Sequence, residues 1–241
     1  MKFGGIYDQI GGGISRYSTD YKWQVPHFEK MLYDNALFTT ALIETYQVTG
    51  KKEFADYAND LLNYIDRDMT SKEGAFFSAE DADSEGVEGK FYVWSKEEIE
   101  NTLGRKTASV AIPFYNVTEK GNFEGKNILY ITKGPEMTAQ EIGMDLDDFC
   151  SELQTAREKL LEVRIRRIRP LLDDKILTSW NSLMISAMAK TGRVLEDTDR
   201  IEKAVRAMQF LVTHLRTEDG KMLRRHRDGE ARYDGYLFDH S

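Results

Sequence analysis

The stretch HFEKMLYDNALFTTALIETYQVTG, residues 27–50, predicts the fold, because its apolar residues recur at the spacing of an amphipathic helix. Pro26 stands just before it, where proline suits the first turn of a helix, and Gly50 provides the stop. His27 and Asp34 then lie on one stripe near the N-terminal end of this helix. The apolar positions are Phe28, Leu32, Ala36, Leu37, Ile43 and Tyr46.

A second amphipathic helix is expected over residues 52–68, and it forms an antiparallel hairpin with the first. The same order of helix, helix, glycine turn and β-hairpin recurs from residue 179 onward. Asn35 aligns with Asn181 at an offset of 146 residues (181 − 35), and Gly74 aligns with Gly220. Because repeated helical hairpins bury their apolar faces against one another, closing them into a ring predicts an α/α toroid with a central pocket.

The segment GAFFSAEDADSEGVEGKFYVW, residues 74–94, is expected to form a β-hairpin whose aromatic ends flank an acidic tip. Clustered carboxylates repel one another, so the tip indicates a cation, a polyol ligand or a solvated turn. Asp81, Asp83 and Glu85 resemble the beginning of a calcium loop, but the twelfth position is Tyr92 instead of glutamate. We therefore predict no metal site.

The composition limits the classes of partner. The chain has 241 residues, a net charge of −8 and a single cysteine, Cys150. An acidic chain is a poor match for nucleic acid or anionic membranes, and one cysteine excludes an internal disulfide. No apolar run is long enough to span a membrane, and the N-terminus lacks the apolar core of a signal peptide. We predict a cytoplasmic protein with no cofactor.

The first 25 residues are rich in glycine and aromatic residues. Gly11-Gly12-Gly13 lacks the lysine and the strand–helix context of a phosphate-binding loop. Glycine more often allows the backbone to approach a ligand or another loop. Arg16 and Tyr17 therefore face either a pocket or solvent.

The middle of the chain carries local signals but little chemistry. Ser95, with Glu98 three residues later, predicts a capped helix that ends near Gly104. Residues 112–132 are expected to be irregular, with one strand at 128–132. Residues 138–169 are expected to be helical and end in the basic cluster RIRRIRP, which complements the helix dipole or binds an anion.

Three segments carry a resemblance to a known family: residues 1–37, the acidic segment 74–94, and RPLLDDKILTSWNSLMISAMA, residues 169–189. They resemble the spermatogenesis-associated protein 20 family, whose bacterial and archaeal members are often called thioredoxin-domain-containing proteins. Family members carry a thioredoxin-like domain and then a six-hairpin (α/α) toroid, similar to those of N-acylglucosamine 2-epimerases and six-hairpin glycosidases.

The resemblance implies a mainly α fold with short β-hairpins. Residues 1–241 are expected to be a partial toroid domain, incomplete and without the thioredoxin-like domain. An incomplete ring leaves apolar faces exposed, so we expect self-association.

The shared motifs also imply a site. Its expected catalytic residues are His27, Asp34, Asp81, Asp83 and Asp174. Its expected substrate-binding residues are Arg16, Tyr17, Glu80, Asp173, Trp180 and Asn181. We expect five of them to line one concave site for a small sugar-like ligand: His27, Asp81, Asp83, Asp174 and Trp180.

Three functions remain open at this point. A carbohydrate-active toroid is the first, because the family's fold relatives act on sugars. An epimerase-like isomerase needs an acid and a base, for which His27 is suited, whereas a glycoside hydrolase needs two carboxyls about 5–10 Å apart. The second is a non-catalytic module that binds a ligand or a domain of a larger thioredoxin-domain protein. A calcium-stiffened loop is the third.

Overall fold

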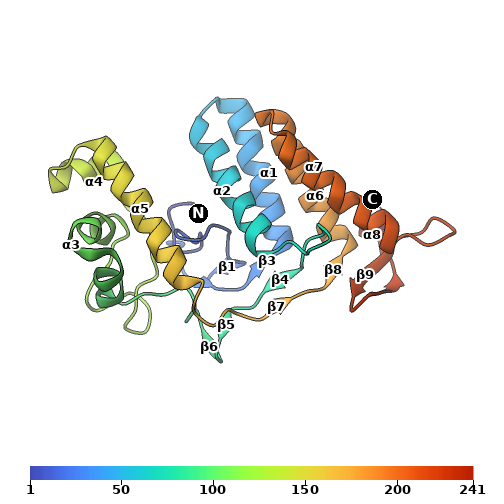
Figure 1. Ribbon diagram of the computed structural model, residues 1–241, viewed down its shortest axis with the longest axis horizontal. Helices are drawn as coiled ribbons and strands as arrows, with labels where there is room; N and C mark the ends of the chain where they lie inside the picture. The colour runs from blue at the N-terminus through green and yellow to red at the C-terminus, as the bar shows by residue number, and fades with distance from the viewer. Residues whose placement is uncertain (241) are drawn as a thin grey trace. The chain divides into compact units, whose positions relative to one another are not determined.

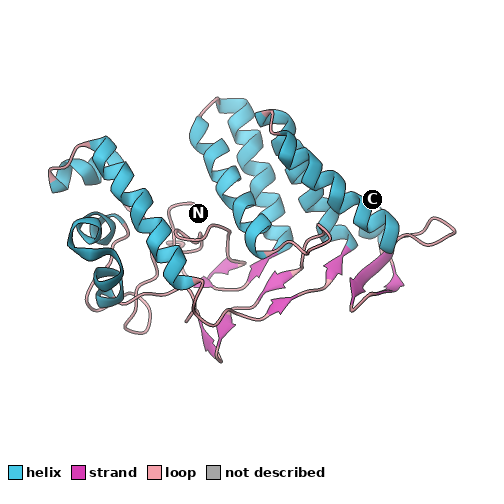
Figure 2. Ribbon diagram, viewed as in Figure 1, coloured by secondary structure: helices cyan, strands magenta, loops and turns pink. Residues whose placement is uncertain are grey.

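The computed structural model describes residues 1–240, in which eight helices and ten short strands form two compact units. Unit 1 comprises Met1–Phe28 and Ala82–Leu171, and unit 2 comprises Glu29–Asp81 and the chain from Leu172 onward. Figure 1 follows the chain through its elements, and Figure 2 distinguishes helices from strands. Six of the eight helices have 17 to 19 residues and every strand is short, so the predicted class, mainly α with short β-hairpins, is confirmed.

The first helical hairpin of unit 2 consists of α1 (Leu32–Thr49) and α2 (Lys52–Asp68). Gly50 separates them with a left-handed conformation (φ 66°), and its N–H donates to the carbonyl of Tyr46 to close the last turn of α1. α2 has one apolar face, because its buried residues recur every three or four positions. These residues are Ala55, Ala58, Leu61, Leu62, Tyr64 and Ile65.

The second hairpin consists of α6 (Thr178–Leu195) and α7 (Thr198–His214). Both ends of both helices lie 146 residues (178 − 32) after the corresponding ends of α1 and α2. α6 packs along α1, so the two hairpins are neighbours in one unit. The repeat that a few sequence identities predicted is confirmed in the bounds of the helices.

The strands around the hairpins keep the same offset. β3 (Lys30–Met31) pairs with β4 (Ala79–Glu80), and β8 (Ile176–Leu177) pairs with β9 (Leu223–Arg227). β4 also pairs with β7 (Leu172–Asp173), and β9 forms a true hairpin with β10 (Glu230–Asp234). Each helical hairpin therefore begins at a small antiparallel sheet. The β-hairpin predicted after Gly220 is confirmed, because β9 pairs with β10. The short helix α8 (Leu237–His240) follows.

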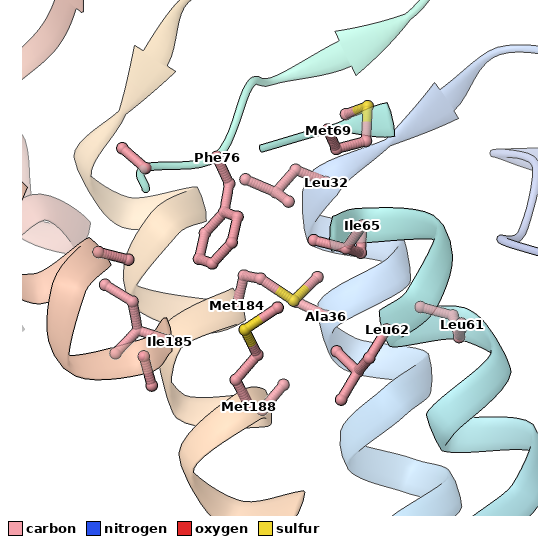
Figure 3. Packing of buried hydrophobic residues seen from close by; sticks show 14 of the residues in the cluster. Leu32, Ala36, Leu61, Leu62, Ile65, Met69, Phe76, Met184, Ile185 and Met188 are labelled. Atoms are coloured by element: carbon pink, nitrogen blue, oxygen red, sulfur yellow. The ribbon is translucent and has the colours of Figure 1, made fainter. Parts of the chain in front are cut away.

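A single hydrophobic core joins the two helical hairpins (Figure 3). Met184 and Met188 of α6 lie among residues of the first hairpin that include Ala36 and Leu62. All four side chains are buried, and burial of a large apolar side chain stabilises the fold by about 1.5–3 kcal/mol. Methionine suits this position because its flexible thioether fills irregular space between helices.

Two buried asparagines hold the beginnings of α1 and α6. Asn35 and Asn181 are repeat equivalents, and each donates from Nδ2 to the carbonyl four residues earlier, Met31 (2.7 Å) and Leu177 (3.0 Å). Asn181 also donates to the Phe76 carbonyl (2.9 Å) and accepts the Phe76 N–H (2.8 Å). Its amide therefore ties the loop after α2 to the first turn of α6.

Unit 1 contains α3 (Lys96–Phe114), α4 (Pro135–Ile142) and α5 (Leu146–Arg164). The capping box predicted at the beginning of α3 is confirmed, because Ser95 Oγ accepts the Glu98 N–H and Glu98 accepts the Ser95 N–H. The helices surround a core of large apolar side chains. That core includes Ile10, Trp94, Ile99, Leu103, Phe114, Phe149 and Leu160.

The helix expected from Pro26 begins at Leu32 instead, so this part of the prediction is wrong. Pro26–His27 is strand β2 and pairs with β1 (Tyr17–Ser18), while β3 pairs with β4 immediately before α1. His27 therefore does not share a helical stripe with Asp34. Pairing with segments distant in the chain overrode a local helical pattern, as happens when strand formation depends on partners.

The acidic hairpin is also shorter than expected. Only β5 (Asp83–Ser84) and β6 (Val87–Glu88) pair, around the turn Glu85-Gly86. The prediction that the aromatic ends pair with each other is wrong, because Phe76 bridges to Thr70 and Trp94 bridges to Asn127. The side chains of Phe76 and Trp94 are each buried in a different hydrophobic core, and this burial holds the two ends apart.

Two smaller expectations in the middle of the chain also need correction. α3 does not end near Gly104 but breaks there (φ 70°) and continues to Phe114. The helical region expected over residues 138–169 is two helices, α4 and α5, separated at Gly143. Residues 112–132 are largely irregular beyond the end of α3, as predicted, but no strand forms at 128–132 within the described residues.

Replacement of Asn181 with alanine should destabilise unit 2 by about 2–4 kcal/mol, because it leaves the buried N–H and carbonyl of Phe76 without their partner. Chemical denaturation followed by circular dichroism measures the change. Ser182→Ala is the matched control: it removes one helix-internal hydrogen bond to Thr178 and should cost less than about 1 kcal/mol. Equal losses for both variants would contradict the role given to Asn181.

Candidate functional site

The residues predicted for the site are divided between the two units. Unit 1 holds Arg16, Tyr17, His27 and Asp83. Unit 2 holds Asp34, Glu80, Asp81, Asp173, Asp174, Trp180 and Asn181. The single concave site expected for His27, Asp81, Asp83, Asp174 and Trp180 joins residues of both units, and it stays a prediction.

In unit 1, two short ladders place His27 between an aromatic ring and a carboxylate. Tyr17 is its cross-strand partner, and the two rings stack with centroids 4.9 Å apart and 20° between their planes. His27 Nδ1 lies 2.7 Å from Glu88 Oε1 on β6. An ionised carboxylate can only accept, so this contact places the proton of a neutral ring on Nδ1 and the lone pair on Nε2.

Glu88 is the residue that sequence reasoning missed. It was visible as one carboxylate of the acidic segment, but nothing in the sequence connected it with His27, which lies 61 residues earlier. Its position follows from the register of β5 and β6, in which Asp83 and Glu88 are partners. Glu85 at the tip forms an ion pair with Lys90 (2.8 Å), which reduces the repulsion within the acidic hairpin.

In unit 2, the buried end of the first repeat contains a lysine and a glutamate on paired strands. Lys30 and Glu80 are cross-strand partners, and both side chains are almost fully buried. Tyr64 donates its hydroxyl hydrogen to Glu80 (3.0 Å), and the Lys30 ammonium lies 4.3 Å from the centre of the Tyr64 ring. Burial of a charge is tolerated only with such partners. Glu80 is therefore firmly held from within the unit.

Asp173, the last residue of β7, and Asp174, which follows it, each form an ion pair with a cation. Asp173 lies 2.6 Å from Lys175, and Asp174 lies 2.8 Å from Arg227. Partial burial acts to raise the pKa of Asp173, but hydrogen bonds from Lys175 and Ser78 and the charge of Lys175 outweigh burial, so the pKa is lowered. Asp173 consequently remains ionised at neutral pH.

A cavity of about 540 Å³ lies in unit 2 beside the beginnings of α1 and α6, and we call it the Trp180 cavity. Trp180 and Tyr33 meet edge to face in its wall, with ring centroids 4.8 Å apart. Asp239 accepts N–H groups of Ser179 (3.1 Å) and Tyr236 (2.8 Å) at its rim. The remaining lining residues are Leu37, Ser182, Leu183, Ser186, Arg224 and Phe238.

The other predicted residues differ in exposure. Asn181 is fully buried and its amide is occupied by backbone groups, so it positions α6 and is not available to a ligand; this part of the prediction needs correction. Asp34 lies half-buried in the first turn of α1, whereas Arg16 and Asp81 are exposed.

Residues 1–240 contain neither a candidate metal site nor a membrane-spanning helix. No cluster of three or more histidine, cysteine, aspartate or glutamate side chains has an arrangement that could hold a metal ion. None of the helices described combines the length and the apolar character needed to cross a bilayer.

Comparison with known proteins relates the chain to one group of proteins, although no family model matches it. Spermatogenesis-associated protein 20 of Homo sapiens is 37% identical over 240 residues, which cover 89% of this chain and 30% of that protein. The Mus musculus protein is 35% identical with the same coverage. An uncharacterised protein of Caenorhabditis elegans is 33% identical over 250 residues, or 93% of this chain and 34% of that one. The resemblance carried by the three motifs is confirmed, and the chain spans about a third of the length of these relatives.

Solved structures give a weaker likeness. Cellobiose 2-epimerase from Bacillus thermoamylovorans is 14% identical, with 95% of this chain and 72% of that chain covered and a TM-score of 0.29. A D-mannose isomerase is 10% identical over 88% and 51% of the two chains, with a TM-score of 0.27. A GH76 α-mannanase of Bacteroides thetaiotaomicron is 14% identical over 94% and 52%, with a TM-score of 0.27. Likeness at these TM-scores carries no argument about what this chain does.

The ion pair of Asp173 should make stability depend on pH in the acidic range. Its folded-state pKa lies below the ordinary value of 3.8, so its contribution is fully present above 3.8 and disappears as the pH falls through the lowered pKa. Asp173→Asn should therefore lower the thermal unfolding midpoint at neutral pH, and the difference from wild type should vanish at strongly acidic pH. Asp228→Asn, at an exposed hairpin tip, is the control. A difference that does not change with pH would contradict the assignment.

Proposed function

As a relative of spermatogenesis-associated protein 20 over 30% of that protein's length, the chain is, we propose, a carbohydrate-active domain that binds a sugar in the Trp180 cavity. The relatives' own substrates do not enter this proposal. The proposal that a sugar binds here rests on the chemistry of the residues that line the cavity.

The observation that carries the proposal is the combination of flat rings and small polar groups around one cavity. Trp180 and Tyr33 offer a ring face and a ring edge, against which the apolar face of a sugar can stack. Ser186 and Arg224 offer groups that donate to sugar hydroxyls, and the hydroxyl oxygens of Ser182 and Ser186 can accept, since Ser182 already donates to Thr178. The volume of about 540 Å³ is in the range of small-ligand sites.

The reaction we propose is of the isomerase or epimerase type, with His27 as the acid–base group. Proton transfer next to a carbonyl needs a group that titrates near neutral pH, and histidine is the side chain that ordinarily does so. The contact with Glu88 holds the ring in place through Nδ1, and we propose that this ring exchanges a proton with substrate. Asp34, Asp81 and Asp83 are not among the residues that line the Trp180 cavity, so their role as sugar-binding groups stays a prediction.

Glycoside hydrolysis is supported less well. It needs two carboxyls facing each other across the scissile bond, one of which must hold a proton. The candidates are Asp34, Asp81, Asp83 and Asp174. The arrangement of Asp174 with Arg227, 2.8 Å away, is typical of a structural ion pair and not of a proton donor.

A non-catalytic sugar-binding module is the second candidate, and one observation favours it. Of the carboxylates in unit 2, Asp239 is the one among the described residues that lines the Trp180 cavity, and it already accepts two backbone N–H groups. A ligand in this cavity would meet rings, hydroxyls and a guanidinium, which bind without supplying an acid–base pair.

Replacement of Trp180 with alanine should weaken sugar binding by at least about tenfold, because it removes the stacking wall of the cavity. Isothermal titration against a panel of mono- and disaccharides measures the dissociation constants. Tyr21→Ala removes an exposed aromatic ring of unit 1 and should leave binding unchanged. If wild type binds no sugar in the panel, or if Trp180→Ala binds as tightly, the sugar-binding proposal is wrong.

For a sugar that binds, replacement of His27 with glutamine should lower the turnover rate by about 10²–10⁴-fold while the dissociation constant stays the same. Proton NMR in deuterated water follows both isomerisation and exchange at the reacting carbon. Glu88→Gln should lower the rate in the same direction, and Glu119→Gln, an exposed carboxylate elsewhere in unit 1, serves as the control. Binding without turnover of any sugar by wild type would instead establish the non-catalytic module.

A further inference from the structure

The outer face of α7 carries a row of exposed apolar side chains, which we call the α7 stripe. Ile201, Val205, Met208 and Val212 make up this row, and each is between 37% and 49% exposed. Their spacing of four, three and four residues places all four on one side of the helix. Single exposed apolar residues are ordinary, whereas a continuous row indicates a surface that another element covers.

The internal repeat identifies what kind of element covers such a surface. At the offset of 146 residues, the α7 stripe corresponds to Ala55, Asn59, Leu62 and Asp66 of α2. That face of α2 is covered within unit 2, because Ala55 and Leu62 are buried and Asp66 contacts α7. The α7 stripe is therefore the continuation of an interface that already exists between the two repeats.

The contacts of that existing interface are polar. Arg200 donates to Asp66 (2.6 Å) and to Asn63 (2.6 Å), and Lys203 donates to Asp66 (2.9 Å). Arg200 is almost completely buried by these contacts, so the pairing is part of the packing between the repeats.

The equivalent positions in the other repeat are apolar on both sides, and the two on α2 are half-buried against the core of unit 2. The two cations of the second repeat correspond to Phe54 and Tyr57 in the first repeat, whose rings lie edge to face with centroids 6.4 Å apart. The aspartate of the first repeat corresponds to Val212 in the second. In the existing interface, Arg200 and Lys203 of the second repeat contact Asp66 of the first. The equivalent residues in the opposite repeats are Phe54 and Tyr57 for the cations and Val212 for the aspartate, and all three are apolar.

From this match we propose that the α7 stripe binds the first helical hairpin of a second copy of the chain, with Phe54 and Tyr57 of that copy seated against Val212. In this contact, the first helical hairpin of one copy packs on α7 of another copy in the way that the second hairpin packs on α2 within a chain. The two surfaces that meet are different parts of the chain. Such a heterologous interface continues from copy to copy and either closes into a ring or grows into a filament. Association should therefore increase steadily with concentration and not stop at a dimer.

Analytical ultracentrifugation of the wild-type chain across the micromolar range tests the proposal. The weight-average mass should rise above the monomer value of 27.8 kDa as concentration increases. Val212→Asp should weaken association by at least about tenfold, because it places an unpaired charge in an apolar contact. Val205→Asp should act in the same way, since it lies on the same stripe. Val48→Asp, which alters an exposed valine at the end of α1, should leave association unchanged.

A charge-pair variant distinguishes this contact from general stickiness. Phe54→Arg alone should weaken association, and Phe54→Arg combined with Val212→Asp should restore it, because the pair recreates the contact between Arg200 and Asp66. Thermal unfolding establishes that each variant remains folded. If Val212→Asp does not fold, Val205→Asp takes its place as the stripe variant. A wild-type chain that stays monomeric overturns the proposal and leaves the stripe to a different partner. Association that none of the stripe variants weakens, or a double variant no better than either single one, also overturns it.

Discussion

The buried amide of Asn181 is the contact on which the organisation of unit 2 depends. It satisfies both backbone groups of Phe76, at the point where the chain leaves α2 and turns toward β4. Two residues later, Ser78 accepts the N–H of Leu32 at the beginning of α1 and donates to Asp173 before β8. One loop is thereby fastened to the beginnings of both long helices. Trp180 precedes Asn181 in the chain, so the hydrogen bonds between Asn181 and Phe76 also fix the position of Trp180 in the cavity wall.

The hairpin helices could be predicted because their signals are local. Apolar spacing, Gly50 and the capping box of Ser95 with Glu98 all act within a few residues, and they gave the helices and their stops, although α1 begins at Leu32 and not at Pro26. The strands could not be predicted in the same way. Pro26 and His27 pair with Ser18 and Tyr17, eight (26 − 18) and ten (27 − 17) residues earlier, while β3 depends on β4 about fifty residues later. Local sequence contains no information about which distant edge a two-residue strand will meet.

The candidate site shows the same division between local and distant signals. Trp180 was recognisable as an aromatic at the beginning of a helix, and it does line a cavity. Asn181 was recognisable as a repeated position, but repetition did not reveal that its amide serves the backbone. Glu88 was overlooked because its contact with His27 requires two separate ladders to be in register. Residue type suggested the chemistry, whereas the partners that decide its use came only from the folded chain.

The order of the two units along the chain has a consequence for synthesis. Unit 1 is formed by Met1–Phe28 and Ala82–Leu171, so the whole of it is synthesised before α6 and α7. The first helical hairpin of unit 2 is made earlier still, and its core residues, among them Leu62 and Ile65, must wait for Met184 and Met188 to cover them. A growing chain thus carries an incomplete core while about 120 further residues are added (184 − 65 = 119). This is the stage at which exposed apolar surface makes nascent chains depend on chaperones, and it arises from the connectivity and not from the final stability.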